Sequence, residues 1–574
     1  MGESSKPSPR YLASARVRRR LAEVRKVFRR KTLLQDTTAG VVLGIESVPD
    51  GLASGLLAGV NPVAGLYAYM FGLAGSAVFA SSTFMAVQAT GAMALVIADT
   101  DLASRPDPAR ALFTLSVLTG VFMIIAGALG GGRLLRFVPT AVMVGFVTAV
   151  GVNIVLGQLP NFTGVEGSGE NRVARAVDTV IHPLLFDPAT IAVAGLTLAL
   201  IIVLTRTPLR SFGLVAAVAV GSLLAWLLNT LPNVQIAVVA DIATIPSGLP
   251  TPVLPSLGDV AFLAIPALSL ACVGLIQGAA VAAGVPNPGG RASDTSGDFI
   301  GQGAGNIVSG LFQGMPVGGS MSASALVVTA GAKTRLALFV ASGVMGLTIL
   351  LISGVVSQVA MPSLAALLIV VGVGAIKPAQ IASVVKTGIL QSTIMAVTFA
   401  LTLLIPLQFA VLVGVGLGII LFVAEQSNRL RVRQITMRDD GRLRESDPSP
   451  AIGAEKVVVL QPYGSLFFAS APVFEAQLPR IEPATRRSVV VLRLRGRDQI
   501  GLALVEVLRR YARVLDEHDS RLFVITTSDR VTGQMAAGGL IGEIGEDAVY
   551  RADEWLGETT RRAYRDAEEW IRGH

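Results

Sequence analysis

The sequence is poor in cysteine, histidine and charge. Its 574 residues include one cysteine, Cys272, and three histidines, His182, His518 and His574. A single cysteine cannot close an intrachain disulfide, and histidines this far apart do not have the spacing of a metal site. Only 15% of the residues are charged, against about 25% in soluble domains. The composition argues against a disulfide framework, a cysteine-based zinc site and a water-soluble protein of this length.

Apolar residues dominate instead. They make up 52% of the chain, and the mean hydropathy is +0.64, which predicts an integral membrane protein. The net charge is +8, but the basic residues cluster beside apolar runs, so we expect membrane lipid as a partner and no nucleic acid. Residues 1–35 are basic and lack the apolar core of a signal peptide, so we expect a cytoplasmic arm there.

A transmembrane domain is predicted over residues 36–425, with fourteen apolar segments. These segments are residues 36–57, 62–80, 84–98, 112–130, 136–157, 189–205, 211–230, 260–283, 298–312, 320–331, 335–356, 357–376, 385–405 and 407–425. Two of them, 84–98 and 320–331, are shorter than the roughly 20 residues of a full span. Each is the third of seven, and such a matched pair indicates an inverted repeat with a binding site near the membrane midplane.

The basic residues of the loops predict the orientation. With the N-terminus inside, the inner loops carry Arg133, Arg136, Arg206, Arg210, Arg291, Lys333, Arg335, Lys377 and Lys386. The outer loops carry Arg105, Arg110, Arg172 and Arg175. Because positively charged loops stay in the cytoplasm, we expect a multi-pass protein of the cell (plasma) membrane with both termini cytoplasmic.

The composition changes after the last apolar segment. Residues 426–455 are polar and contain prolines, and we interpret them as a linker. Residues 456–574 show the pattern of a soluble α/β domain. Strands are predicted at 457–460, 488–494 and 521–526, and helices at 502–517, 532–540 and 552–572.

Polar groups interrupt the apolar stretch at residues 43–98. Pro49-Asp50-Gly51 interrupts its first run, Glu46 lies one helical turn before Asp50, and Gln88-Ala89-Thr90-Gly91 lies near the start of the short segment. Ionisable groups and irregular backbone occur at membrane depth only where they are buried in protein or line a cavity. The stretch therefore predicts the wall of a polar site.

Five motifs together give the chain a family resemblance. They are Asp36-x-x-Ala39-Gly40, Val48-Pro49-x-Gly51-Leu52-Ala53, Gly59-Val60-x-Pro62-Val63-x-Gly65-Leu66-Tyr67, Ile300-Gly301-Gln302-Gly303-x-x-Asn306, and Gly319-Ser320-x-Ser322 followed by Ala330-Gly331-Ala332-Lys333-Thr334. With them the chain resembles the sulfate permease (SulP) family of anion transporters, and its C-terminal part resembles a STAS domain. The resemblance implies an α-helical membrane protein of 14 transmembrane segments in a 7+7 inverted repeat, with core and gate domains, a cytoplasmic α/β STAS domain and a homodimer.

The resemblance also implies where substrate binds, namely between the N-termini of half-helices in the third and tenth segments. The residues at these positions are Gln88, Ala89, Thr90, Gly91, Gly319, Ser320, Met321 and Ser322. Helix N-termini suit an anion because they offer unpaired N–H groups and partial positive charge. Close helix packing is the alternative explanation for the small residues.

The chain departs from the family at three polar positions. Many relatives have an acidic residue where this chain has Gln277, an arginine where it has Ala323, and a glutamine where it has Asp50. An ionised carboxylate in the membrane is costly, so we expect Asp50, with Glu46 and Gln277, to serve a coupling H⁺ or Na⁺. A structural role for the two carboxylates is the alternative, and no other cofactor or metal is expected.

These features favour a secondary active transporter of small inorganic anions, sulfate-like or bicarbonate-like, and not an enzyme. There is no Walker motif that would indicate ATP as the energy source. A neutral or organic solute, such as a nucleobase or dicarboxylate, fits the same architecture. A membrane-anchored STAS scaffold is the third interpretation. In the STAS part, the turn Asp498-Gln499-Ile500-Gly501 lacks the serine that soluble relatives phosphorylate, so we expect no phosphorylation switch there.

Overall fold

The computed structural model describes residues 30–132, 139–169, 171–207, 212–242, 248–285, 287–288, 293–437, 443–494, 496–552 and 558–573. Most of the predicted basic arm, and Arg133, Arg136, Arg210 and Arg291 of the predicted inner loops, lie outside these residues. The chain forms two compact units, Met1–Gly418 and Ile419–His574.

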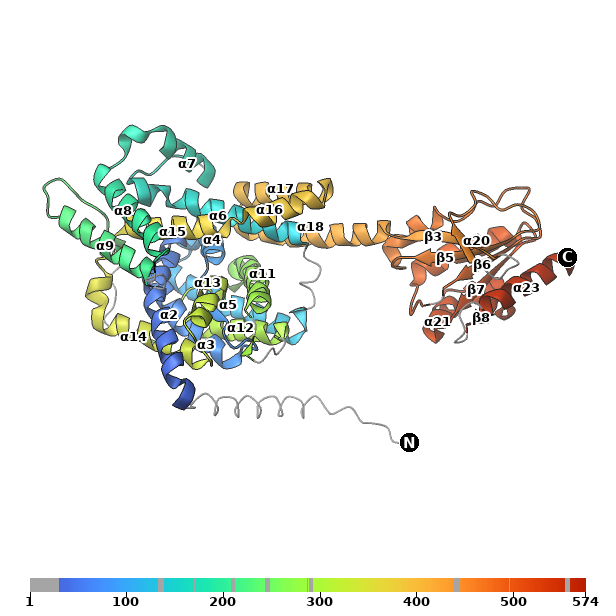
Figure 1. Cartoon of the computed structure of the whole chain (residues 1–574), viewed down its shortest axis with the longest axis horizontal. Coiled ribbons are helices and arrows are strands. Elements are labelled where there is room, and N and C mark those ends of the chain that lie inside the picture. Colours follow the sequence, from blue (N-terminus) through green and yellow to red (C-terminus); the bar gives the residue numbers. More distant parts are fainter. Residues whose placement is uncertain are drawn as a thin grey trace. The chain divides into compact units, whose positions relative to one another are not determined.

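The first unit consists mainly of helices (Figure 1). Its described residues also contain one short ribbon of two strands. Its elements are α2 (Arg30–Leu57), α3 (Pro62–Phe79), β1 (Ala86–Gln88), α4 (Gly91–Ala98), α5 (Pro108–Ala128), α6 (Thr140–Thr163), α7 (Arg172–Ile181), α8 (Pro188–Leu204), α9 (Gly213–Leu228), α10 (Val239–Ile242), α11 (Val260–Gly284), α12 (Thr295–Leu311), β2 (Gly318–Ser320), α13 (Met321–Thr329), α14 (Leu336–Val356), α15 (Met361–Ala375), α16 (Pro378–Thr387), α17 (Ile389–Leu404) and α18 (Leu407–Asn428), the last of which continues into the second unit.

Every predicted apolar segment contains a helix or half-helix of the structure. Among the described residues, seven helices are long and apolar enough to cross a membrane, and three further apolar helices are shorter, at α8, α9 and α17. The chain is therefore a multi-pass membrane protein, while the count of fourteen spans stays a prediction.

The membrane helices pack as two groups. Helices α2, α3, α4, α5, α11, α12, α13 and α14 pack on one another, and α6, α7, α8, α9, α15 and α17 form the second group. Glycines allow close packing within the first group: a Cβ on Gly65 of α3 would lie 2.0 Å from the carbonyl oxygen of Gly51 on α2, and one on Gly303 of α12 would lie 2.6 Å from that of Gly120 on α5. The groups meet where α4 packs against α6 and α2 against α15. This division confirms the core and gate arrangement implied by the resemblance.

Pro49 does not break the first membrane segment, contrary to the prediction. Helix α2 runs through it without interruption for 28 residues. Proline removes one backbone donor from the helix, but α2 packs along α3 and α14 on either side of this point. That packing stabilises the helix across the missing hydrogen bond, and Asp50 consequently lies in the middle of a helix.

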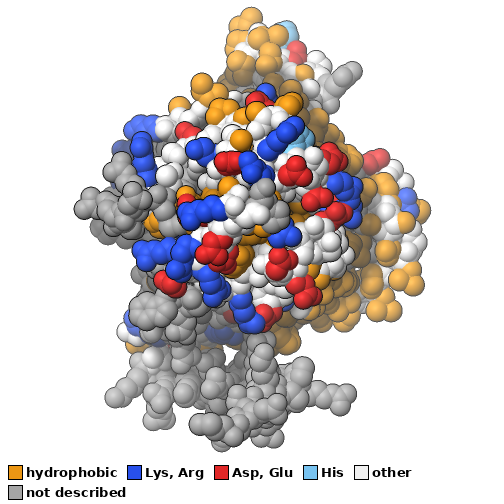
Figure 2. Space-filling model, turned by 90° about the vertical axis from the view of Figure 1, so that its right-hand side faces the viewer, with side chains coloured by type: hydrophobic (Ala, Val, Ile, Leu, Met, Phe, Trp, Pro, Cys, Tyr) orange, Lys and Arg blue, Asp and Glu red, His pale blue; other side chains and the backbone are white. Residues whose placement is uncertain are grey.

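The second unit is a six-stranded sheet with helices. Its elements are β3 (Arg431–Met437), β4 (Leu443–Ser446), β5 (Val457–Tyr463), α19 (Ala471–Glu475), β6 (Val489–Arg493), α20 (Leu502–Asp516), β7 (Arg521–Thr526), α21 (Asp529–Ala537), α22 (Leu540–Ile544), β8 (Val549–Arg551) and α23 (Glu558–Gly573). The strand order is β4-β3-β5-β6-β7-β8, and β5 to β8 are parallel. This is the α/β architecture expected of a STAS domain. Basic and acidic side chains are mixed over its surface in Figure 2, as on a domain surrounded by water.

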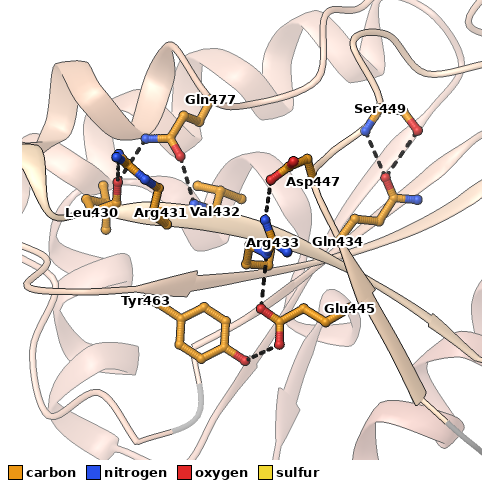
Figure 3. Close-up of polar contacts among 10 residues, drawn as sticks. All are labelled: Leu430, Arg431, Val432, Arg433, Gln434, Glu445, Asp447, Ser449, Tyr463 and Gln477. Carbon is orange, nitrogen blue, oxygen red and sulfur yellow. Dashed lines mark hydrogen bonds and ion pairs between the residues drawn. The ribbon is translucent and has the colours of Figure 1, made fainter.

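Residues 426–455 are not a plain linker. They contain the end of α18 and strands β3 and β4, and β3 pairs antiparallel with β5. Polar contacts accompany the strand pairing (Figure 3): the Gln477 amide accepts from Val432 N (2.9 Å) and donates to Leu430 O (3.1 Å). Arg433 bonds Glu445 and Asp447. The first strands of the sheet therefore precede the predicted boundary at residue 456.

Candidate functional site

The two short segments meet in the ribbon between β1 and β2. The strands are antiparallel, with Ala86 opposite Ser320 and Gln88 opposite Gly318. Helix α4 begins just after β1 and helix α13 directly after β2. Because the strands run in opposite directions, the helices leave the ribbon in opposite directions. Their N-termini are therefore turned toward each other across it, as the resemblance implies.

Both half-helices are capped in the same way. The Thr90 hydroxyl accepts from Met93 N (3.4 Å), and the Ser320 hydroxyl accepts from Ala323 N (3.3 Å). A cap of this kind satisfies the third N–H of a helix and leaves those of the first two positions without an intrahelical partner. In α4 these positions are Gly91 and Ala92, and in α13 they are Met321 and Ser322. The ribbon thus brings together two pairs of donors and two positive helix ends.

Buried side chains of α12 and α13 hold the ribbon. Gln302 Oε1 accepts from Gly319 N (3.0 Å). The Asn306 amide donates to Val317 O (2.7 Å) and accepts from Val317 N (2.9 Å). Ser324 Oγ accepts from Ala86 N (2.9 Å) and so joins α13 to β1. The motif from Ile300 to Asn306 therefore supports the strand that leads into α13.

Several hydroxyl and amide groups lie beside the two helix ends. Thr90 Oγ1 donates to Gln277 Oε1 on α11 (3.0 Å). Ser320 Oγ and Ser322 Oγ are 3.2 Å apart. Thr90, Gly91 and Gln277 are partly exposed, and Met321 and Ser322 are exposed. Four predicted site residues and Gln277 thus have surface free for a ligand.

Other predicted site residues are buried. Ala89 and Gly319 contribute backbone to the ribbon and the α4 cap and have almost no exposed surface. Gln88 is 1% exposed, and its amide donates to Ser47 Oγ on α2 (2.7 Å). The Gln88 side chain therefore ties β1 to α2 and does not extend toward the helix ends.

Tyr69 links the predicted carboxylate to the α4 cap. Its hydroxyl lies 2.6 Å from Asp50 Oδ2 and 2.9 Å from the carbonyl oxygen of Ala89, the residue before Thr90. Ser54 Oγ is 3.2 Å away on the other side. Glu46 is partly buried on the same face of α2, one turn before Asp50. The Tyr69 phenol therefore connects Asp50 to the backbone at the α4 cap.

Sequence reasoning missed Tyr69, Ser54 and Ser324. Tyr69 lies in a nearly uniform apolar segment, where hydropathy does not show which turn faces a carboxylate on another helix. Gln302 and Asn306 were found as motif residues, but their bonds to β2 could not be read from their spacing. Among the described residues, no group of three or more His, Cys, Asp or Glu side chains could hold a metal ion.

Comparison with known proteins gives the family. Residues 33–398 match the sulfate permease family. YbaR of Bacillus subtilis, a candidate sulfate transporter, is 28% identical over 448 residues, which are 76% of this chain and 83% of that protein. The bicarbonate transporter BicA of Picosynechococcus sp. is 25% identical over 449 residues, 76% of this chain and 79% of BicA.

A solved structure shares the fold of the whole chain. The murine anion transporter Slc26a9 superposes with a TM-score of 0.83 over 100% of this chain and 96% of that chain, at 18% sequence identity. Identity this low shows the fold alone. With the family match over most of the chain and a ribbon between two capped half-helices, the chain belongs to the sulfate permease family of membrane transporters and is not an enzyme.

Proposed function

We propose that the chain is a secondary transporter of a small inorganic anion such as sulfate or bicarbonate, which binds between the N-termini of α4 and α13. The observation that carries the proposal is the matched pair of capped helix ends on one ribbon. Each end offers about half a positive charge and unpaired donors to an anion. The sulfate and bicarbonate transporters among the relatives support the same class of substrate.

In this proposal the substrate is held mainly by backbone and hydroxyl groups. The N–H groups of Gly91, Ala92, Met321 and Ser322 donate to the anion, and the Ser322 hydroxyl donates beside them. The Thr90 hydroxyl, which donates to Gln277 Oε1 in the structure, turns from Gln277 to the anion when the anion binds. Ala323 is buried and carries no charge, so no arginine takes part at this position. Small residues at both helix ends let the anion approach the backbone closely.

We propose proton coupling at Asp50, and the number of hydrogens available at Tyr69 supports it. A phenol carries one proton, and the Ala89 carbonyl can only accept. The contacts of 2.6 Å to Asp50 and 2.9 Å to Ala89 are both hydrogen bonds only when Asp50 carries a proton and donates to Tyr69. When Asp50 loses its proton, Tyr69 donates to the carboxylate and releases Ala89 O beside the α4 cap.

Electrostatics also favours a protonated Asp50 when the anion is bound. An ionised Asp50 would repel an anion at the α4 end, and this costs free energy because only the Tyr69 hydroxyl separates the carboxylate from the α4 cap and the effective dielectric inside the protein is low. A proton, or Na⁺ held with Glu46 and Gln277, removes that cost. Binding of the coupling ion and of the anion then favour each other, and the coupling is reciprocal.

Further features follow the family resemblance. We propose a homodimer in the cell membrane with both termini cytoplasmic, a transport domain at 36–425 and a C-terminal STAS domain that serves assembly. The six-stranded unit supports a separate C-terminal domain, because it has a core of its own.

Uptake into proteoliposomes tests the proposed function. Labelled sulfate, bicarbonate and uracil are offered with and without an inward proton gradient. We expect uptake of an inorganic anion that rises with the gradient, and none of uracil. Uptake of uracil alone would favour the neutral-solute alternative, and uptake of no solute would favour the scaffold.

A further inference from the structure

A polar cavity lies at the opposite end of α4 from the ribbon. It has a volume of about 240 Å³ and is bounded by the ends of α2 and α4 and by α6 and α7. Its polar side chains are those of Gln158, Asn161, Arg172 and Arg175, and none of the described residues that line it is acidic. Helix α4 has 8 residues, so the cavity is about 12 Å from Gly91 along the helix.

Arg172 joins the two helix groups beside this cavity. Its guanidinium forms an ion pair of 2.7 Å with Asp99, the residue that caps the carboxyl end of α4, and both side chains are largely buried. Arg172 is also the first residue of α7, where the helix dipole disfavours a cation. Asp99 and the negative end of α4 offset that cost.

Arg175 lies one turn farther along α7 and is exposed. Among the described residues its guanidinium has no ion pair, while Asp99 neutralises Arg172. The cavity wall therefore carries a net positive charge from a group that can approach an oxyanion with several N–H donors.

We propose that this cavity is a second anion subsite, on the face predicted to be external, where the transported anion binds before it reaches the ribbon. The inference rests on the proposed function for the identity of the anion. Arg175 and Arg172 hold the anion, with the amides of Gln158 and Asn161 beside them. An anion here competes with Asp99 for Arg172 and so weakens the ion pair that joins α4 to α7.

Gly157 provides a reporter position for a test on the full chain. A Cβ there would meet only Arg172 Cδ, at 3.9 Å, so a cysteine fits without displacement. In a Gly157→Cys, Cys272→Ser chain in nanodiscs, the rate of labelling by a membrane-impermeant thiol reagent is measured against sulfate concentration at constant ionic strength. Sulfate in the cavity should slow the labelling.

Three added substitutions identify what binds the sulfate. Arg175→Gln should raise the half-protecting sulfate concentration by about 3- to 10-fold, since a close opposite charge is lost. Arg110→Gln is the matched control, because Arg110 is also an outer-loop arginine but donates to Leu254 O and does not line the cavity. Ser322→Ala, at the ribbon, should leave the protection unchanged.

The proposal is overturned if sulfate gives no protection or if Arg175→Gln and Arg110→Gln act alike. It is also overturned if Ser322→Ala abolishes the protection, because the protection would then come from sulfate bound at the ribbon. Labelling does not require transport. Failure of the proposed function would give a different result. Sulfate would still protect the introduced cysteine of the reporter chain, but the wild-type chain would take up no sulfate into proteoliposomes.

Discussion

Tyr69 is the residue on which the coupling account depends. Its hydroxyl contacts a carboxylate of α2, a hydroxyl of α2 and the carbonyl that precedes the α4 cap. One proton cannot serve every acceptor around it, so the protonation of Asp50 decides which bond Tyr69 makes. Through Tyr69, the protonation of Asp50 can act on the proposed substrate site without a direct contact between the two.

The pH dependence of uptake tests that route. Wild-type uptake should rise as the external pH falls, because protonated Asp50 removes the repulsion of the anion and restores the bond from Tyr69 to Ala89. Asp50→Asn cannot titrate, so its uptake should lose this dependence, and Tyr69→Phe should weaken it. Glu46→Gln is the control on the same face of α2. If Asp50→Asn keeps the wild-type pH profile while Glu46→Gln loses it, the coupling residue is Glu46.

Removing the Ser322 hydroxyl tests the proposed anion site between the N-termini of α4 and α13. A hydrogen bond to a charged group contributes roughly 1.5–3 kcal/mol, so Ser322→Ala should weaken anion binding about tenfold or more. Calorimetric titration of the purified chain measures the change. Thr329→Ala is the control, because Thr329 is an exposed hydroxyl at the other end of α13 and bonds only Leu326 O. Equal affinities of Ser322→Ala and the wild type would reject the hydroxyl as a ligand.

At the scale of elements, the ribbon depends on side chains that come from elsewhere in the chain. Asn306 satisfies both backbone groups of Val317 just before β2. Removing it leaves a buried donor and a buried acceptor unpaired, at about 1–3 kcal/mol each. The position of α13 should therefore depend on this amide.

Asn306→Ala should lower both the melting midpoint in detergent and the affinity for the anion. Gln313→Ala is the control. Gln313 lies just after the end of α12, is partly exposed, and donates to Thr251 O, so its loss should change neither the melting midpoint nor the affinity. A thermal scan by intrinsic fluorescence, followed by calorimetry, gives the two readouts. Full anion affinity in Asn306→Ala would show that the ribbon forms without its support.

The elements differ in how well the sequence predicts them. Apolar length located the membrane helices, and the two short segments located the half-helices. Strands β1 and β2 could not be predicted, because each has three residues and they pair across more than two hundred residues of chain. Pro49 gave a wrong prediction, because packing on both sides of α2 outweighs one lost hydrogen bond. The Asp50–Tyr69 contact depends on helix rotation, which an apolar segment does not reveal.

At the scale of the molecule, the second unit begins earlier than composition suggests. Strand β3 buries Val432 and Ile435, and Leu430 just before it is also buried. Burial of one such side chain contributes about 1.5–3 kcal/mol. Together they approach the whole stability of a small domain, about 5–15 kcal/mol. Composition did not reveal β3 and β4 because most of their other side chains are polar and face water.

Two fragments test this boundary. Residues 429–574 should fold and melt cooperatively by circular dichroism, whereas residues 456–574, which lack β3 and β4, should melt at a much lower temperature or remain unfolded. A third fragment, 429–574 with Arg433→Ala, is the control, because it loses only exposed ion pairs of small value. Equal melting of the first two fragments would show that β3 and β4 are dispensable.

The central claim is that an inorganic anion binds between the N-termini of α4 and α13, and locating a bound anion tests it most directly. Selenate has the shape and charge of sulfate, and its selenium atom gives an anomalous X-ray signal. In crystals of the full chain soaked with selenate, we predict an anomalous peak within hydrogen-bond distance of the backbone nitrogens of Gly91 and Ser322. Bound selenate elsewhere in the membrane unit, with no peak between the two helix ends, would contradict the account.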